Sequence, residues 1–193
     1  YYTPVDLAED LINKSIEVIG IDNISEFVEP SAGNGSFSNI LSKIKPTVAI
    51  DIEPECKDII EADYLSYKIE YKKGRCVIGN PPFGSKMLLA RDFFNKSIME
   101  GDYVAFILPI SQIDNDVFLY KFDLIHSEDL GEVVFSDRSV HCCFNIYRRP
   151  KGGKLNKTPK YDLPEDIVLI LDYRKGKDMV FNDRYIRVCS RGG

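Results

Sequence analysis

One stretch of the chain indicates its architecture: Ser25-Glu26-Phe27-Val28-Glu29-Pro30-Ser31-Ala32-Gly33-Asn34-Gly35-Ser36-Phe37. A short apolar run, predicted to be a strand over residues 25–28, ends at an acid and a proline and enters a glycine-rich turn. Residues 37–44 then have the pattern of a helix, and residues 47–52 that of a second strand. Strands that alternate with helices in this way are typical of a parallel sheet.

The same alternation continues on both sides of this stretch. Residues 4–19 carry a helical stripe of apolar side chains, with Thr3 as the predicted N-cap and Pro4 at the first helical position. The segments that follow are predicted strands at 75–79, 103–108, 132–135 and 142–147, a helix at 88–99, and a further strand candidate at 166–173. Because the strands are almost continuously apolar, we expect an α/β fold with helices on both faces of a mostly parallel sheet.

The glycine-rich turn excludes two common phosphate-binding motifs. Its spacing matches neither G-x-G-x-x-G, the dinucleotide fingerprint, nor G-x-x-x-x-G-K-[ST], the P-loop. Glycines still let a backbone approach a ligand closely, and in open α/β sheets ligands bind beyond the carboxyl ends of the strands. Taken alone, Gly33 and Gly35 are compatible with a ligand site or with a plain tight turn.

Three acids mark predicted strand ends: Glu29, Asp51 and Asp63. Asp51 follows Gly33 by 18 residues and can accept two hydrogen bonds from ribose hydroxyls, as acids at this position do in dinucleotide sites. Each acid taken singly is more often a solvated surface residue. Together they predict a ligand with an ammonium group, a ribose and an exocyclic amine.

The most specific segment is Cys76-Val77-Ile78-Gly79-Asn80-Pro81-Pro82-Phe83-Gly84. Its two prolines fix φ and remove two backbone donors, so the turn is rigid and its carbonyls have no helix to join. We expect the Asn80 side-chain oxygen and the Pro81 carbonyl to hold one NH₂ group, with Phe83 offering a face for stacking. The alternative is an ordinary strand terminator with a core phenylalanine, and the upstream acids make it the weaker interpretation.

In the order of these segments, from Tyr2-Thr3-Pro4 to Asn80-Pro81-Pro82-Phe83, the chain resembles the S-adenosylmethionine-dependent amino-methyltransferases. It is most similar to the N6-adenine DNA methyltransferases in which the cofactor motifs precede the catalytic turn. The resemblance covers residues 1–149 and implies a Rossmann-like class I methyltransferase fold, with a mostly parallel seven-stranded sheet and helices on both faces. It also implies S-adenosylmethionine as the cofactor and no metal.

Carried to the matching positions, the resemblance assigns residues to the cofactor. Thr3 and Pro4 would lie against the methionine end, which Glu29 and the glycine turn would hold. Asp51 would bind the ribose hydroxyls, and Asp63 would receive the adenine amine beside the Tyr64 amide. The implied cofactor-binding set is Tyr2, Thr3, Pro4, Glu29, Ser31, Ala32, Gly33, Gly35, Asp51, Ile52, Asp63, Tyr64 and Asn80.

The implied catalytic set is Asn80, Pro81, Pro82, Phe83 and Phe144. Asn80 and Pro81 would hold the amine of a flipped adenine, and Phe83 and Phe144 would pack on the base. The implied activity is methyl transfer to N6 of adenine in DNA, in which positioning is the main catalytic contribution. The alternatives are an RNA adenine methyltransferase, a release-factor glutamine methyltransferase, and a non-catalytic subunit that binds cofactor or nucleic acid.

Length and composition are those of an ordinary globular domain. The chain has 193 residues, of which 44% are hydrophobic and 28% charged, so collagen, low-complexity disorder and a disulfide scaffold are excluded. No apolar run approaches the ~20 residues that span a bilayer, and Tyr1-Tyr2-Thr3-Pro4 lacks the pattern of a signal peptide. The five cysteines form no C-x-x-C pair and there are two histidines. We therefore expect a cytoplasmic protein with reduced thiols and without a metal site or a membrane partner.

Charge divides the chain unevenly. Residues 1–147 hold 13 Lys and Arg against 24 Asp and Glu, whereas residues 148–193 hold 12 against 6. We predict a catalytic domain over residues 1–149 and a basic C-terminal extension over 150–193 that packs on or beside it. The extension is either a solubilising segment or a contact for nucleic acid. Because 44 residues follow Arg149, we expect a catalytic core of a larger protein, a small enzyme with weak sequence specificity, or an enzyme that needs a partner subunit for recognition. The role, in restriction-modification, phage modification or regulation, stays open.

Overall fold

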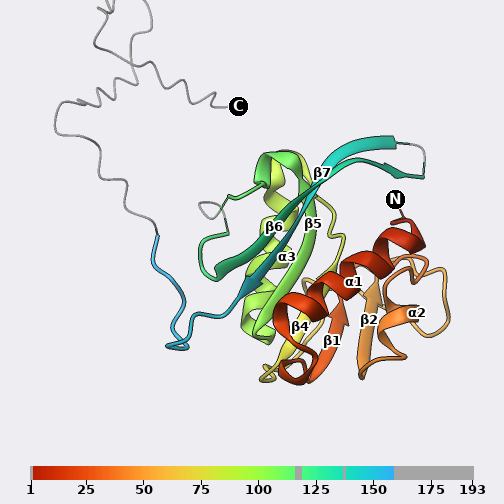
Figure 1. Cartoon of the computed structure of the whole chain (residues 1–193). Helices are drawn as coiled ribbons and strands as arrows, with labels where there is room; N and C mark the ends of the chain where they lie inside the picture. Colours follow the sequence, from red (N-terminus) through yellow and green to blue (C-terminus); the bar gives the residue numbers. More distant parts are fainter. Residues whose placement is uncertain (1, 116–118, 137, 159–193) are drawn as a thin grey trace, which may run out of the picture. The chain divides into compact units, whose positions relative to one another are not determined.

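The computed structural model describes residues 2–115, 119–136 and 138–158. Over these residues the chain forms a seven-stranded sheet in the order β3-β2-β1-β4-β5-β7-β6 (Figure 1). The strands are β1 (Glu26–Glu29), β2 (Thr47–Asp51), β3 (Ile60–Glu61), β4 (Arg75–Gly79), β5 (Tyr103–Pro109), β6 (Asp123–Phe135) and β7 (Arg138–Arg148). β1 to β5 pair in parallel, whereas β7 runs antiparallel to β5 and β6. The predicted mostly parallel sheet is confirmed.

Helices cover both faces of the sheet, as predicted (Figure 1). α1 (Val5–Ile19) and α2 (Ser38–Leu41) pack on one face, and α3 (Leu88–Glu100) packs on the other. Because successive side chains of a strand point to opposite faces, Ile107 of β5 packs on the α1 side and Phe106 on the α3 side. Both faces of the central strands are thus buried, which explains their almost continuously apolar sequences.

The first helix begins one residue later than predicted. Pro4 occupies the N-cap of α1, and no side chain caps the helix. Thr3 is buried instead, and its carbonyl accepts a hydrogen bond from the Ser36 hydroxyl at 2.7 Å. The segment before α1 is therefore fixed against the glycine-rich turn.

The largest departures from the predicted elements are in α2 and β6. α2 is shorter than the predicted helix, and the chain continues from it in turns, with the Ile44 amide donating to the Leu41 carbonyl at 2.9 Å. β6 begins at Asp123, although a strand was predicted only over residues 132–135. Its first half is polar because β6 is the edge of the sheet and meets water, so hydrophobicity did not reveal it. Residues 166–173, the further strand candidate, lie outside the described residues.

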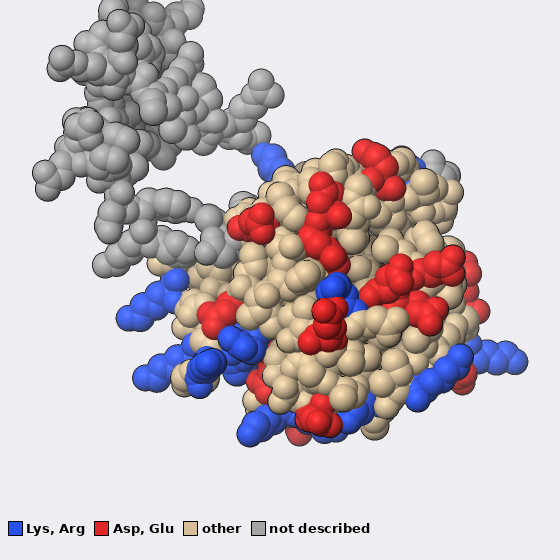
Figure 2. All heavy atoms as spheres, in the orientation of Figure 1, with Lys and Arg blue, Asp and Glu red and all other residues tan. Residues whose placement is uncertain are grey.

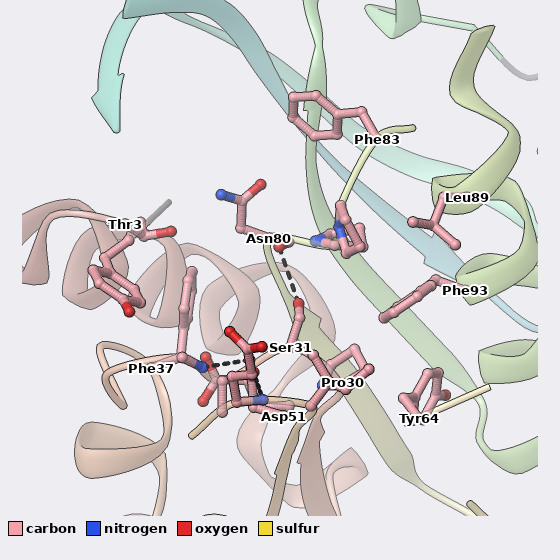
Figure 3. A pocket seen from close by; sticks show the side chains of 18 of the residues that line it. Thr3, Pro30, Ser31, Phe37, Asp51, Tyr64, Asn80, Phe83, Leu89 and Phe93 are labelled. Atoms are coloured by element: carbon pink, nitrogen blue, oxygen red, sulfur yellow. Dashed lines mark hydrogen bonds between the residues drawn. The ribbon is translucent and has the colours of Figure 1, made fainter. Parts of the chain in front are cut away.

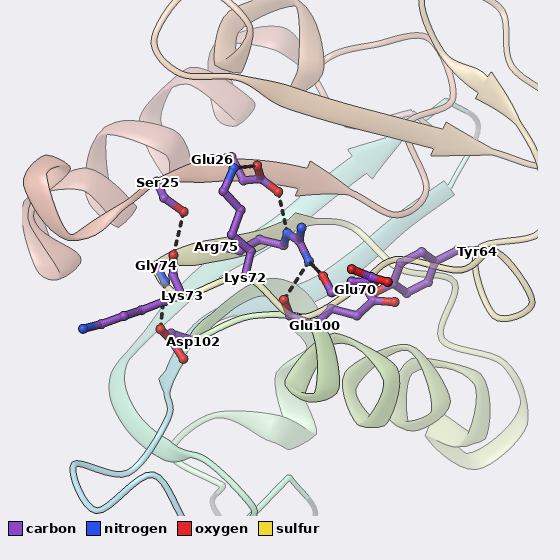
Figure 4. Close-up of polar contacts among 10 residues, drawn as sticks. All are labelled: Ser25, Glu26, Tyr64, Glu70, Lys72, Lys73, Gly74, Arg75, Glu100 and Asp102. Carbon is purple, nitrogen blue, oxygen red and sulfur yellow. Dashed lines mark hydrogen bonds and ion pairs between the residues drawn. The ribbon is translucent and has the colours of Figure 1, made fainter.

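An ionic network, buried at Glu26, Arg75 and Glu100, holds the edge at which the parallel strands begin, called the amino edge below (Figure 4). Arg75 donates from Nε to Glu26 at 2.6 Å and from a terminal nitrogen to the Glu100 carbonyl at 2.7 Å. Lys72 pairs with the second carboxylate oxygen of Glu26. Glu26, Lys72, Arg75 and Glu100, the amino-edge network, tie β1 and β4 to the end of α3.

The end of the described chain is anchored at the same edge. Arg149 Nε donates to Asp102 at 2.8 Å, and the Asn156 amide donates to the Lys121 carbonyl at 3.0 Å. Asn156, in the predicted C-terminal extension, thus contacts the start of β6, and the compact unit reaches Thr158. Residues 159–193 lie outside the described part of the chain. In the described ranges no helix has the length and apolar character needed to cross a membrane.

Candidate functional site

The turn after β1 contains a buried carboxyl group. Glu29, the last residue of β1, is 2% exposed and accepts a hydrogen bond from the Ser38 amide at 2.8 Å. Burial raises the pKa of Glu29 to about 8, although the hydrogen bonds from Ser38 act in the opposite direction. Such a carboxyl group ionises readily once a cation lies beside it.

The glycine turn requires glycine at position 33. Gly33 adopts a φ of 50°, and a Cβ there would lie 2.8 Å from the Tyr2 ring. The Gly33 amide donates to Asp51 Oδ2 at 2.7 Å, and Asp51 Oδ1 accepts from the Glu53 amide at 2.9 Å. These contacts fix the Asp51 carboxylate at the edge where the parallel strands end, called the carboxy edge below.

Asp63 and Tyr64 follow β3 at the same edge. Asp63 accepts hydrogen bonds from the Leu65 amide at 2.9 Å and from the Ser66 hydroxyl at 3.2 Å. The Tyr64 ring lies 5.2 Å from the ring of Phe93, measured between centroids. Tyr64 and Phe93 thereby form an aromatic wall beside the Asp63 carboxylate.

The turn after β4 presents its polar groups to the same space. The Asn80 carbonyl accepts a hydrogen bond from the Ser31 hydroxyl at 3.0 Å, which fixes the backbone of the turn. Figure 3 shows the Asn80 side chain pointing into the pocket, on the side where Phe83 lies. Within the described residues, neither the Asn80 side-chain amide nor the Pro81 carbonyl has a hydrogen-bond partner. Both groups are therefore available to a ligand.

These side chains line one pocket of about 860 Å³, a volume typical of cofactor and ligand sites. The predicted residues that line it are Tyr2, Thr3, Glu29, Ser31, Ala32, Gly33, Asp51, Ile52, Asp63, Tyr64, Asn80, Pro81, Pro82 and Phe83. The structure thus brings together most of the residues that the sequence singled out, from four separate strand ends.

Three predicted residues lie outside this pocket. Pro4 is exposed at the start of α1. Gly35 closes the glycine turn, where its amide donates to the Ala32 carbonyl at 2.7 Å. Phe144 is fully buried in the core on the α1 side of the sheet, opposite Ile107 of β5. Phe144 is thus not among the residues that line the pocket, and in this structure core residues enclose the ring that the resemblance assigned to packing on a flipped base.

Other residues that line the pocket were not predicted from the sequence. Among them are Phe37, Leu89, Phe93, Phe135, Arg138 and Val140. Leu89 and Phe93 are four residues apart on α3 and so share one face of that helix. That spacing, directly after the Asn-Pro-Pro-Phe turn, was a signal that could have found them. Phe135, Arg138 and Val140 lie on the β6–β7 hairpin, and only the register of these two strands brings them to the pocket.

No cysteine or histidine lines the pocket in the described part of the chain. No group of three or more His, Cys, Asp or Glu residues there could hold a metal ion. Cys56, Cys76, Cys142 and Cys143 are free thiols. Burial raises the pKa of Cys142 to about 11, which keeps this thiol protonated and unreactive at neutral pH.

The chain is similar to known proteins in its three-dimensional structure, whereas its sequence matches none of those compared. No protein-family model matches the chain, and no curated protein matches it in sequence. Thermoplasma acidophilum 1320 resembles it with a TM-score of 0.59 and 18% identity, over 77% of this chain and 88% of that one. The 23S rRNA methyltransferase ErmE gives 0.54 and 13%, over 74% and 68%. The METTL16 MTase domain gives 0.53 and 11%, over 77% and 69%.

At these identities the likeness concerns the fold. The chain has the Rossmann-like fold of the class I S-adenosylmethionine-dependent methyltransferases, as predicted. The antiparallel β7 makes its sheet mixed at one side. In this fold the pocket lies at the carboxy edge, which is where an open α/β sheet binds its ligands.

Proposed function

We propose that this chain is a methyltransferase that moves a methyl group from S-adenosylmethionine to the exocyclic N6 amine of adenine in nucleic acid. The observation that carries the proposal is the turn after β4. There the Asn80 side chain points into the pocket beside the ring of Phe83, and Pro81 lines the same pocket. Neither the Asn80 side chain nor the Pro81 carbonyl has a hydrogen-bond partner among the described residues. Two acceptors next to an aromatic face fit an amine on a planar base.

The remaining walls of the pocket fit S-adenosylmethionine. The Glu29 carboxyl suits the ammonium group, Asp51 the ribose hydroxyls, and Asp63 with the Tyr64–Phe93 wall suits the adenine. A Cβ at position 33 would collide with the Tyr2 ring, so only glycine lets Tyr2 pack on the turn that lines the pocket. When bound, this cofactor supplies an electrophilic methyl group on a positively charged sulfonium.

The residues of the turn would act by positioning. Asn80 and Pro81 accept hydrogen bonds from the target amine, which holds the amine and directs its lone pair outward. Phe83 stacks on the base and keeps it in one plane. Holding the two reactants in line lowers the barrier without any ionisable group, because most of the gain comes from orientation.

Two nucleic acids are candidates for the substrate that carries the adenine, DNA and RNA. DNA follows from the resemblance of the motif order to the N6-adenine DNA methyltransferases. RNA is the second candidate, and it is favoured by the fold likeness to an enzyme that bears the name 23S rRNA methyltransferase. In either case we propose that a partner subunit or a further domain supplies recognition of the target sequence.

Methyl transfer from tritiated S-adenosylmethionine to DNA, RNA and protein pools tests the proposal. We expect Asn80→Ala to lower transfer by about 100- to 1,000-fold, the loss typical of a positioned polar group at a reacting centre. The matched control is Asn39→Ala, which removes an exposed asparagine from α2. Equal activity of wild type and Asn80→Ala, or transfer to protein alone, would contradict the proposal. Thermal stabilisation by the cofactor should persist in both variants.

A further inference from the structure

The β6–β7 hairpin forms one wall of the pocket near the catalytic turn. Phe135 and Arg138 are opposite one another where the hairpin turns, and Val140 follows two residues later on the same face. All three line the pocket. Phe83 packs against the same apolar cluster as Phe135 and Val140, so this wall adjoins the part of the pocket proposed for the target base.

The hairpin turn is also connected to the segment before α1. The Tyr2 amide donates to Ser136 Oγ at 3.4 Å, a long hydrogen bond. The Tyr2 hydroxyl in turn donates to Glu55, in the loop after β2. Strand register therefore places Arg138 at the pocket, and the hydrogen bond between Tyr2 and Ser136 connects the hairpin to the N-terminal segment.

Charge makes Arg138 exceptional in this pocket. The described lining residues include four acids, Glu29, Asp51, Glu53 and Asp63, and Arg138 is the sole Lys or Arg among them. In Figure 2 many Asp and Glu side chains gather over the upper and right parts of the face that carries α1, and many Lys and Arg lie along the lower edge. A nucleic acid that approaches the pocket therefore meets mostly negative charge, which opposes binding.

We propose that Arg138 binds a backbone phosphate next to the target adenine, and the proposal rests on the function proposed above. A flipped base enters the pocket while its phosphates stay at the rim. Arg138 is exposed, whereas Glu29 at the pocket floor is buried. A guanidinium is well suited to a phosphate because it donates two parallel hydrogen bonds to its oxygens. Arg138 would thus select a nucleotide within a chain over free adenine.

The test measures binding of adenine-containing DNA and RNA oligonucleotides by fluorescence anisotropy at several salt concentrations. We expect Arg138→Gln to weaken binding by about five- to tenfold and to reduce the slope of log K against log salt by about 0.7 to 0.9, the contribution of one phosphate. Arg138→Lys should keep most of the slope, because it keeps the charge. Lys43→Ala, which removes an exposed cation outside the pocket, is the control and should leave both quantities unchanged.

Affinity for S-adenosylmethionine, measured by calorimetry, separates the possible outcomes. We expect it to change less than about twofold in Arg138→Gln. If Arg138→Gln lowered the affinity for S-adenosylmethionine and left the salt slope at the wild-type value, the proposal would be overturned. Arg138 would then be assigned to the carboxylate of the cofactor. A wild type that binds the cofactor and neither oligonucleotide would overturn the proposed function itself. Oligonucleotide binding with the same slope in wild type and Arg138→Gln would overturn only the role of Arg138.

Discussion

The two ends of β1 carry buried glutamates in opposite electrostatic states. Glu26 at the amino edge is 8% exposed and Glu29 at the carboxy edge is 2% exposed. Burial alone would raise the pKa of Glu26, but the hydrogen bonds and charges of Lys72 and Arg75 outweigh it and hold the pKa below its ordinary value. No Lys or Arg within the described ranges pairs with Glu29, and burial raises its pKa to about 8.

We infer that the difference separates residues that stabilise the fold from residues that the proposed function assigns to ligand binding. At the amino edge each buried charge is compensated within the chain, as expected of groups whose role is stability. At the carboxy edge the compensation is incomplete, as expected where an external cation and an amine complete the site. The following predictions test this division, beginning with the largest expected effect.

Breaking the amino-edge network should destabilise the whole domain. Arg75→Met leaves the carboxylate of Glu26 buried beside Lys72 alone, and removal of one partner from a buried ion pair costs about 3–5 kcal/mol. Urea unfolding followed by circular dichroism measures the loss. The double variant Glu26→Gln with Arg75→Met should recover part of it. A loss below about 1 kcal/mol in the single variant would show that the network is dispensable.

Changing an acid at the carboxy edge should affect ligand binding far more than folding. Asp51→Asn removes the charge but keeps a side chain that can accept from the Gly33 amide. Because hydrogen bonds to charged groups contribute about 1.5–3 kcal/mol, we expect the Kd for S-adenosylmethionine to rise about 10- to 100-fold. Asp58→Asn, an exposed acid outside the pocket, is the calorimetric control. An unchanged Kd in Asp51→Asn would remove this residue from the cofactor site.

The raised pKa of Glu29 predicts a pH dependence with a definite sign. A carboxyl group whose pKa is higher in the folded than in the unfolded state stabilises the fold at low pH, and this contribution is lost as pH rises through about 8. A cationic ligand favours the ionised form, so binding should release a proton, and affinity should rise by at most about tenfold between pH 6 and 7. Calorimetry in buffers of different ionisation enthalpy counts the protons. Glu29→Gln should release none, and proton uptake by wild type would contradict the prediction.

The sequence was sufficient for the parts of the molecule that depend on local pattern. The apolar runs of β4 and β5 and the Asn80-Pro81-Pro82-Phe83 turn identified the sheet and one wall of the pocket. The site therefore follows in large part from where strands end, because the carboxyl ends of parallel strands meet at one edge.

The sequence did not reveal how the residues of β5, β6 and β7 pair across the sheet. Phe144 lies on the α1 side of the sheet because successive side chains of β7 alternate between the two faces, and its pairing opposite Ile107 is fixed only once β5 and β7 are aligned. Two irregularities in β6, between Leu124 and His126 and between Asp129 and Gly131, shift that alignment further. Arg138 was missed for the same reason. An arginine in a polar hairpin has no local signal, and its place at the pocket depends on long-range pairing.

Tyr64 connects the carboxy edge of the sheet to the amino-edge network. Its substitution should have the smallest effect of those predicted. Its ring lines the pocket, while its hydroxyl donates to Glu100 Oε2 at 2.7 Å and lies 3.0 Å from the Ser97 hydroxyl. Burial and the charge of Glu100 raise the pKa of Tyr64 above its ordinary range, so the hydroxyl stays protonated as a donor. Glu100 in turn pairs with Lys96 at 2.7 Å, and its carbonyl accepts from Arg75.

Tyr64→Phe keeps the ring against Phe93 and removes only this connection. Because the buried Glu100 oxygen loses its donor, we expect the free energy of unfolding to fall by about 1–2 kcal/mol. The Kd for S-adenosylmethionine should rise less than about threefold, because the aromatic wall remains. Tyr67→Phe, on a tyrosine outside the pocket lining, controls for loss of a hydroxyl. A Kd that rises tenfold or more at unchanged stability would mean that the Tyr64 hydroxyl belongs to the ligand site. Tyr64 would then be a ligand-binding residue in full, and its contact with Glu100 would not serve the stability of the amino edge.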